Sequence, residues 1–404
     1  MSLTHDRYNI LKSNKYPILI TIGFFLVTTC VSFFYHNFWT IFDQDGLIYL
    51  SAGQQILAGT GNNVSLPNSG PAGPILFAAL EMITNNGLFA TKIVSIFSGT
   101  AIVFFSYHVF RNIFDYRIAI VSQLFIAFNP WIGILSISSQ NDLTPISLAI
   151  ISIYFITKNK LKFFDIIISA SLLGAAFMFR TQPIIFFFAI IIFLILIAKD
   201  KKFKIIGVAL FIIFFILLCS PMLYYNISTH DTLLDSNTNY YIAAHSKYST
   251  PEWKDYLFDN ISKDKQAFLS DHNLLLKNYF YNLFYGQPNN LFGFENKISS
   301  SLIPAIPILG LIPALGGLIL FLKISPTRKT FLGIFLTSSI TTALIFLIGN
   351  IQDHFFAIVM IPIIFLGIQN FKKLDKKFSL LITITVIFSL VMAILPLHSY
   401  KHFL

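Results

Sequence analysis

Long apolar segments, separated by short polar ones, dominate the pattern along this chain of 404 residues. A helix needs about 17–25 mostly apolar residues to cross a bilayer. We predict about eleven such spans, at 17–35, 89–110, 118–136, 143–157, 163–180, 183–198, 204–225, 302–322, 330–349, 354–370 and 378–397. The apolar segment 74–86 is too short to span, so we interpret it as a helix lying in the membrane interface.

The polar segments divide the chain into three parts. Residues 1–225 form a membrane core that contains the first outer loop at 36–88, and residues 302–404 form the last spans. Between them, 226–301 is a long outer segment rich in acidic residues, Tyr and Asn. We therefore predict an all-α integral membrane fold, with interfacial helices in the first outer loop and a large outer loop between the seventh and eighth spans.

Composition agrees with this assignment and indicates an orientation. Hydrophobic residues make up 55% of the chain and charged residues 11%, whereas a soluble domain carries about 25% charged residues. The basic residues concentrate in alternate segments between the spans, which predicts a multi-pass cell-membrane protein with a cytoplasmic N-terminus. The net charge of +10 then anchors helix ends at the anionic inner leaflet and implies no nucleic-acid partner. Cys30 and Cys219 lie in apolar runs and give no disulfide framework or metal-ligand spacing.

Several ionisable residues fall at the outer ends of predicted spans, where a charged group needs a physical reason. They come from separate parts of the sequence but all lie at the outer face of the membrane in the predicted topology. We therefore expect them to meet in one outer cavity. These residues are Asp43, Asp45, Lys92, Asp142, Arg180, Asp353 and His354. Their convergence is the main indication of a functional site.

The two acidic residues in FDQDGLIYLSAGQQILAGTG have two interpretations. If residues 44–57 are helical and the helix ends at Gly59, Asp45 and Tyr49 share one face by their spacing of four. Either Asp43 or Asp45 then caps the helix, or one of them acts in the site. A cap needs one carboxylate, and this stretch supplies two.

The other outer charges also have a structural and a functional interpretation. Asp142 is either the N-cap of the fourth span or a site residue. Arg180 and Lys92 either extend to lipid headgroups or bind an anion, since a guanidinium suits phosphate. His354, beside Asp353, is either an interfacial residue or a metal-binding or proton-transfer group.

Together these motifs resemble the polytopic glycosyltransferases of superfamily C, in the branch of protein O-mannosyltransferases and lipid A aminoarabinose transferases. The first outer loop of that family carries an Asp, a Tyr four positions later, and a helix that ends in a glycine-rich turn. DGLIYLSAGQQILAGTG and PNSGPAGPILFAALEMI fit this pattern, and NPWIGILSISSQND, FMFRTQPIIFFF and SPMLYYNISTHDTLLDSNTNYY resemble its later segments. The resemblance covers most of residues 17–245.

The resemblance implies an inverting transfer of a sugar from a polyprenyl-phosphate donor in the bilayer to an acceptor hydroxyl on the extracytoplasmic side. The acceptor is a protein, a lipid or a glycan, and the outer segment 226–301 is expected to select it. By the same resemblance Asp45 accepts the proton of that hydroxyl, and Asp142 orients the acceptor or holds a cationic group. The remaining members of the set are Asp43, as a cap or supporting carboxylate, and the substrate-binding residues Tyr49, Lys92, Arg180 and His354.

No cofactor is firmly predicted. Two carboxylates suit a divalent ion such as Mg²⁺ or Mn²⁺, so a metal between Asp45 and Asp142 stays an open alternative. Two positions depart from the family pattern: Gly46 stands where an acidic residue usually follows the loop Asp, and His354 stands where Arg often opens the tenth span. A weaker or pH-dependent phosphate contact at His354 follows.

Two other classes of protein compete with the transferase. One is a transporter or lipid flippase, and the other is an assembly subunit without catalytic activity. Transporters usually place polar groups near the middle of the membrane, whereas the middles of these predicted spans are almost free of charge. This distribution favours the transferase.

Overall fold

The computed structural model describes residues 2–34, 43–60, 70–113, 116–128, 130–180, 183–197 and 200–230. The outer segment beyond 230, the four predicted spans between 302 and 397, and His354 lie outside the described residues. The regular elements of the described part are α-helices, in agreement with the predicted all-α class. They are α1 (Ser2–Phe34), α2 (Asp43–Leu57), α3 (Ala72–Thr84), α4 (Gly87–Ile113), α5 (Tyr116–Ala127), α6 (Pro130–Ile137), α7 (Leu143–Ile156), α8 (Phe163–Phe179), α9 (Ile184–Ile197) and α10 (Lys201–His230).

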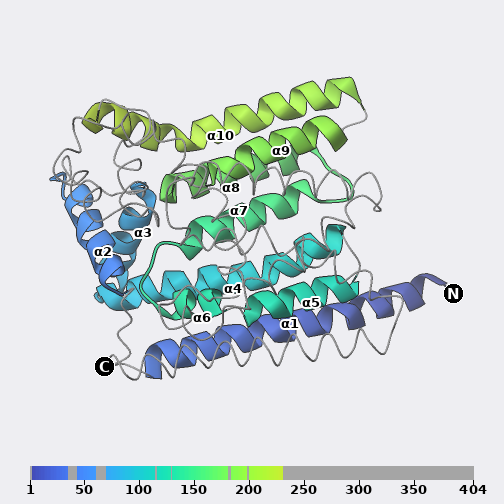
Figure 1. The fold of residues 1–404 in the computed structure, drawn as a ribbon, viewed down its shortest axis with the longest axis horizontal. Coiled ribbons are helices and arrows are strands. Elements are labelled where there is room, and N and C mark those ends of the chain that lie inside the picture. Colours follow the sequence, from blue (N-terminus) through green and yellow to red (C-terminus); the bar gives the residue numbers. More distant parts are fainter. Residues whose placement is uncertain are drawn as a thin grey trace, which may run out of the picture.

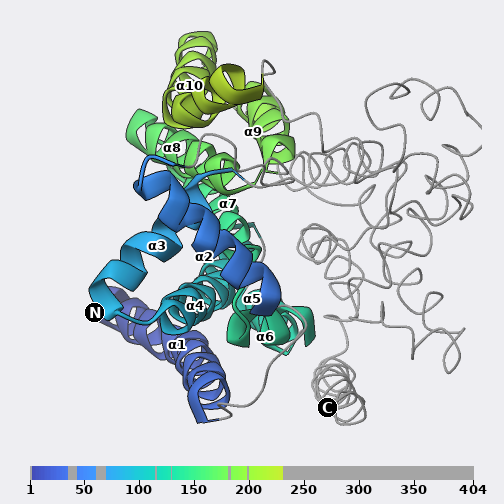
Figure 2. The same cartoon turned by 90° about the vertical axis from the view of Figure 1, so that its left-hand side faces the viewer.

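Most of these helices run along one common direction, and two of them cover one end of the bundle (Figures 1 and 2). The helices α2 and α3 lie across that end, while the first residues of α1 and of α10 are at the opposite end (Figure 1). The two ends therefore differ, with short crossing helices at one and the starts of α1 and α10 at the other (Figure 1).

Among the described residues, three helices are long and apolar enough to cross a membrane, judged by length and composition. They contain the segments Lys15–Phe33, Gly87–Asn112 and Lys201–Tyr224. The apolar helices α7, α8 and α9 are shorter, at 14, 17 and 14 residues. The helix α3 has 13 residues, which agrees with the prediction that the segment 74–86 is too short to span.

One predicted span is interrupted. The segment 118–136, predicted as a single helix, is divided into α5 and α6, and Pro130 is the first residue of α6. Proline lacks the N–H that would continue a preceding helix, but its fixed φ suits the first turn of a new one. The prediction of a continuous helix was therefore wrong at this point.

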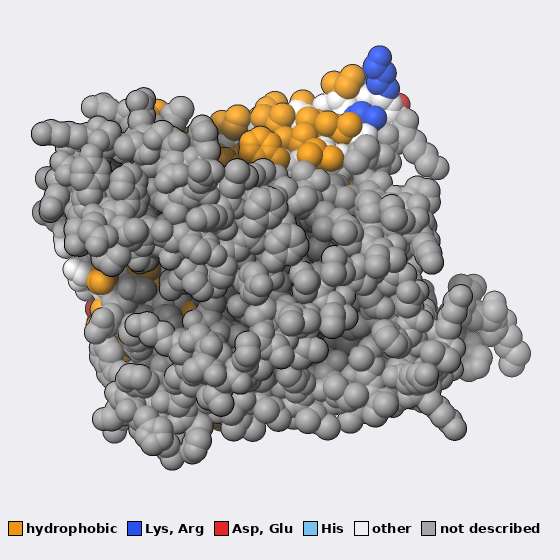
Figure 3. Space-filling view, viewed as in Figure 1, with side chains coloured by type: hydrophobic (Ala, Val, Ile, Leu, Met, Phe, Trp, Pro, Cys, Tyr) orange, Lys and Arg blue, Asp and Glu red, His pale blue; other side chains and the backbone are white. Residues whose placement is uncertain are grey.

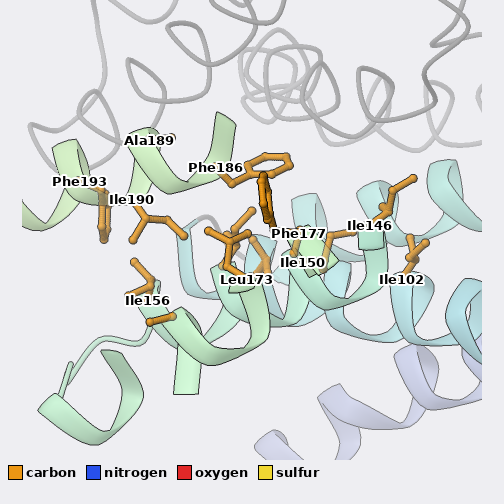
Figure 4. Packing of buried hydrophobic residues seen from close by; sticks show 14 of the residues in the cluster. Ile102, Ile146, Ile150, Ile156, Leu173, Phe177, Phe186, Ala189, Ile190 and Phe193 are labelled. Carbon is orange, nitrogen blue, oxygen red and sulfur yellow. The ribbon is translucent and has the colours of Figure 1, made fainter. Parts of the chain in front are cut away.

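The core of the described part lies between α4, α7, α8, α9 and α10. Leu173 and Phe177 of α8 are buried, and they pack with Ile150 of α7 and with Phe186 and Ile190 of α9 (Figure 4). Buried hydroxyl groups add hydrogen bonds between helices, which is favourable where no water is available. Such pairs are Ser98–Thr144 at 3.0 Å and Ser152–Ser169 at 2.7 Å.

The outer face of α10 is apolar along most of its length (Figure 3). Ile213, Ile216 and Leu217 are exposed there, and Lys201 and Lys202 are exposed where the helix begins. An apolar face with basic residues at one end is the pattern of a helix that faces lipid and begins at a headgroup region.

Candidate functional site

The centre of the candidate site is the turn 138–142 between α6 and α7. This turn lies at the end of the bundle that α2 and α3 cover (Figure 1). Its residues Ser138, Ser139 and Asn141 are completely buried, and Gln140 is 5% exposed. Buried polar groups are retained where they are hydrogen-bonded or serve a function. The residues that contact this turn should therefore show why it is buried.

The helix α4 holds the turn from one side. The Ser95 hydroxyl donates to the Gln140 carbonyl at 3.0 Å, and the Gln140 N–H donates back to the Ser95 oxygen at 3.4 Å. Lys92 lies one helical turn before Ser95, and only 6% of it is exposed. Among the described residues no ion pair or hydrogen bond involves its ammonium group. The structure therefore places a buried cation beside the turn.

The end of α8 holds the turn from a second side. Asp142 forms a salt bridge with Arg180, and the two side chains are 16% and 15% exposed. Asn141 donates from Nδ2 to the Phe179 carbonyl at 3.5 Å, and the backbone N–H of Gly70 donates to the same oxygen at 3.0 Å. Two consecutive turn residues thus bind two consecutive residues where α8 ends, which fixes the direction of the Arg180 side chain.

Unpartnered polar atoms remain in this contact. In the described part of the chain, the Nε of Arg180 and the Oδ1 of Asn141 are buried and have no hydrogen-bond partner. A buried donor without an acceptor is costly. It is the kind of feature that a functional site retains.

Glycines bring α2 and α3 against the turn. A Cβ built at Gly46 would lie 2.5 Å from the Cβ of Ser139 and closer still to its carbonyl oxygen, and a Cβ at Gly73 would overlap the Asn141 amide. Asp43 and Asp45 are in the first turn of α2, so the backbone of Asp45 directly precedes the contact at Gly46. Asp45 and Asp142 are therefore carried by backbone segments that touch.

Tyr49 follows one turn later on α2. It packs, partly buried, against a small cluster of Leu50, Phe77 and Val94, which joins α2, α3 and α4. This cluster fixes the crossing helices against the first part of α4. The sequence-predicted residues Asp45, Tyr49, Lys92, Asp142 and Arg180 thus lie on elements that meet around one turn, whereas Asp353 and His354 lie outside the described residues.

Several structural alternatives are now decided. Asp142 occupies the N-cap position of α7 but makes no side-chain capping hydrogen bond, so the cap interpretation of its carboxylate is wrong. Arg180 and Lys92 do not extend into lipid headgroups, since both are largely buried. Gly59 has φ +72° and ends α2 through hydrogen bonds from Gly59 to Ile56 and from Thr60 to Gln55. This geometry is a Schellman motif, and it confirms the predicted helix end.

Sequence reasoning missed the residues that assemble the site. Gly46 was noted only as a missing acidic residue, and Ser95 and Gly73 were not singled out. Ser95 and Gly99 are four residues apart on α4, and a Cβ at Gly99 would overlap the Ser136 hydroxyl. Such small residues spaced by four are a known sign of close helix packing in membranes, and this signal was available in the sequence.

The described residues do not form a metal centre. None of their His, Cys, Asp and Glu side chains gather in a group of three or more. The carboxylate of Asp142, one of the two proposed ligands, pairs with the cationic Arg180, and a divalent ion there would be repelled by the guanidinium. The open alternative of a metal between Asp45 and Asp142 therefore gains no support from the groups around Asp142.

Comparison with known proteins bears on the family. Residues 68–225 match the family described as dolichyl-phosphate-mannose-protein mannosyltransferase. This range includes Lys92, the turn 138–142 and Arg180, but begins after Asp45. No curated protein matches the sequence of the chain significantly.

Solved structures share the fold. The oligosaccharyltransferase of Archaeoglobus fulgidus, in complex with Zn and sulfate, has a TM-score of 0.57 at 14% identity, with 93% of this chain and 53% of that chain covered. The same enzyme tethered to an acceptor peptide with the NVT sequon has a TM-score of 0.59 at 15% identity, with 94% and 55% covered. ArnT from Cupriavidus metallidurans bound to undecaprenyl phosphate has a TM-score of 0.52 at 14% identity, with 87% and 59% covered. The chain thus spans a little over half the length of the structures that it matches.

The protein is a multi-pass membrane protein with the fold of the polytopic glycosyltransferases of superfamily C. The match of residues 68–225 to the mannosyltransferase family agrees with the branch that the motifs indicated, that of the protein O-mannosyltransferases and aminoarabinose transferases.

Proposed function

We propose that the protein is a glycosyltransferase that moves a sugar from a polyprenyl-phosphate donor to an acceptor hydroxyl, with inversion, on the extracytoplasmic side. One observation carries this proposal. Two largely buried cations, Lys92 and Arg180, and two acidic positions, Asp45 and Asp142, lie on elements that meet at the turn 138–142. A phosphate leaving group needs the cations, and a hydroxyl nucleophile needs a base.

Asp45 is the proposed general base. The acceptor hydroxyl attacks the anomeric carbon while its proton passes to the Asp45 carboxylate, and the bond between that carbon and the phosphate oxygen breaks. The electron pair of that bond stays on the lipid phosphate. A positioned carboxylate contributes about 10²- to 10⁴-fold to such a step.

Lys92 and Arg180 are the proposed phosphate-binding residues. The donor is a phosphodiester with one negative charge, and the released lipid phosphate gains further charge as it leaves. Cations that are fixed in a water-poor site stabilise developing charge strongly. The burial of both side chains supports this role, and Tyr49 and His354 are proposed as further substrate-binding residues.

Asp142 is proposed to hold Arg180 in place. Of its two expected roles, orienting the acceptor or holding a cationic group, the salt bridge to Arg180 supports the second. Asp43, at the start of α2, is proposed as the cap or supporting carboxylate.

Two of the similar structures contain a bound lipid phosphate, which supports a lipid-linked donor. ArnT was solved with undecaprenyl phosphate, and AglB of Archaeoglobus fulgidus was solved with an inhibitory peptide and a dolichol-phosphate. Both lipids are polyprenyl phosphates, which is the leaving group that the proposal requires. A transporter or flippase remains the competing function, and it would require no base at Asp45.

The test uses purified protein in detergent or nanodiscs. Polyprenyl-phosphate sugars with a radiolabelled sugar are incubated with peptide, lipid or glycan acceptors, and the release of lipid phosphate is measured together with the labelled product. Asp45→Asn should lower transfer by about 10²-fold or more. The control is Asp200→Asn at the opposite end, where the carboxylate only accepts hydrogen bonds from the backbone of Lys202 and Phe203. Near-normal transfer by Asp45→Asn would remove the base from the mechanism, and donor binding without transfer by the wild type would favour the transporter.

A further inference from the structure

The helix α2 approaches the turn 138–142 closely at Gly46. This glycine is buried in the first turns of the helix. A Cβ at this position would lie 2.5 Å from the Ser139 Cβ, 2.8 Å from its carbonyl carbon, and nearer still to the carbonyl oxygen. Because two of these three neighbours are backbone atoms, no rotamer change removes the overlap. Any side chain at position 46 must move the helix or the turn.

The turn is the less movable of the two partners. Ser95 holds Gln140 from α4, Asn141 holds the Phe179 carbonyl, and Asp142 pairs with Arg180. By contrast, the contacts of α2 are mainly with α3 and, more weakly, with α4. A side chain at position 46 would therefore displace the start of α2 and, with it, the backbone of Asp45.

We propose that Gly46 is a positioning residue: its lack of a side chain seats the start of α2 on the Ser139 backbone and so sets the place of Asp45 relative to Asp142 and Arg180. This inference rests on the proposed function of Asp45. It also explains the departure from the family pattern, because the Ser139 backbone fills the place that a second carboxylate at position 46 would need. The loop then supplies a single base.

The expected effect is on the chemical step rather than on donor binding. Displacing a reacting group by about 1 Å costs on the order of 10²-fold in rate. Gly46→Ala should therefore lower kcat about 10- to 100-fold. Its KM for the donor should change little, because Lys92 and Arg180 are not on α2 and Tyr49 lies one turn further along it, where the cluster of Leu50, Phe77 and Val94 holds it. Alanine is also the better helix former, so a purely local effect on α2 would not reduce its stability.

The experiment compares Gly46→Ala and Gly46→Asp with two matched controls. Gly53→Ala places a Cβ in an equally close contact on the same helix, but against Pro74 of α3, and Gly133→Ala places one in open space on α6. Steady-state transfer gives kcat and KM, and binding of the lipid phosphate and thermal unfolding report on folding. The proposal predicts a loss of kcat with retained lipid binding at position 46, in both variants, and a clearly smaller loss in the controls.

Three results would overturn the proposal: wild-type kcat in Gly46→Ala, an equal kcat loss in Gly53→Ala, or higher activity in Gly46→Asp. If Gly46→Ala does not fold, Ser95→Ala is used instead, because it removes the contact between the turn and α4. That variant should lose about 3- to 10-fold in kcat, because it lacks both hydrogen bonds between the Ser95 hydroxyl and the Gln140 backbone. Its control is Ser98→Ala, whose hydroxyl bonds to Thr144 of α7; equal kcat values for the two serine variants would refute the proposal. Failure of the proposed function can be distinguished from failure of the proposal for Gly46, because in the first case the wild-type protein would release no lipid phosphate.

Discussion

The salt bridge between Asp142 and Arg180 gives the sharpest test of the candidate site. The two side chains are 16% and 15% exposed, so removing one partner leaves the other with little water to solvate its charge. Breaking a buried pair in this way costs about 3–5 kcal/mol. Because some exposure remains, we expect the lower end of that range, about 3 kcal/mol.

This energy predicts a measurable loss of thermal stability. The unfolding entropy is about 2.1 cal/mol/K per residue, so for 404 residues a loss of about 3 kcal/mol in Asp142→Asn or Arg180→Gln should lower Tm by roughly 3–4 °C. The double variant removes both charges together. Its loss of stability should be smaller than the sum of the losses in the two single variants, with a coupling energy of about 2 kcal/mol. The double variant should regain stability but not transfer, because Arg180 is the proposed phosphate ligand.

The assay is thermal unfolding of purified protein in detergent, followed by intrinsic fluorescence. Membrane proteins often unfold irreversibly, so all variants are compared at one scan rate. Asp200→Asn serves as the control, because this carboxylate is exposed and asparagine can accept the same hydrogen bonds from the backbone of Lys202 and Phe203. Additive losses in the Asp142/Arg180 double variant, or an unchanged Tm in Asp142→Asn, would refute the reasoning.

Further predictions concern a cation, a helix end and metal dependence. Lys92→Met should lower kcat/KM for the donor about 10²-fold without lowering Tm, because a buried ammonium is costly to the fold; a change within twofold would exclude a phosphate contact. Gly59→Ala should cost about 1–2 kcal/mol, since φ is +72° there and left-handed backbone strains other residues, whereas Gly133→Ala should leave Tm unchanged. Transfer should persist in excess chelator, because Arg180 occupies the Asp142 carboxylate; activity lost with chelator and restored by Mn²⁺ would contradict this.

The positions of several helices could be predicted from the apolar pattern alone. The spans expected at 143–157 and 163–180 correspond to α7 and α8 almost to the residue. Burial of a helix in lipid or in a lipid-facing core requires an unbroken apolar run, so each boundary is marked by local composition. The break before Pro130 was missed because the run of apolar residues continues across it, although proline carried the signal.

The sequence could predict that the site residues lie at the same end of their helices, but not which of these residues contact one another. Topology placed Lys92, Asp142 and Arg180 at the same end of their spans, and the structure brings their elements together. The pairing of Asp142 with Arg180 depends on how α7 and α8 pack, and no local pattern encodes that distance. Gly46 shows the same limit, because its role depends on Ser139, which is far away in the sequence.

The charges of the site suggest why one cation is paired and the other is not. Among the described residues Lys92 has no counter-charge, whereas Arg180 is balanced by Asp142. The donor carries one negative charge and the departing lipid phosphate nearly two, so a cation that binds both equally would not accelerate the reaction. Pairing with Asp142 weakens the attraction of Arg180 for the donor. The guanidinium then interacts more strongly with the phosphate in the transition state, where negative charge develops. Asp142→Asn should then bind the donor more tightly yet transfer more slowly, and weaker donor binding with unchanged kcat would contradict this division of roles.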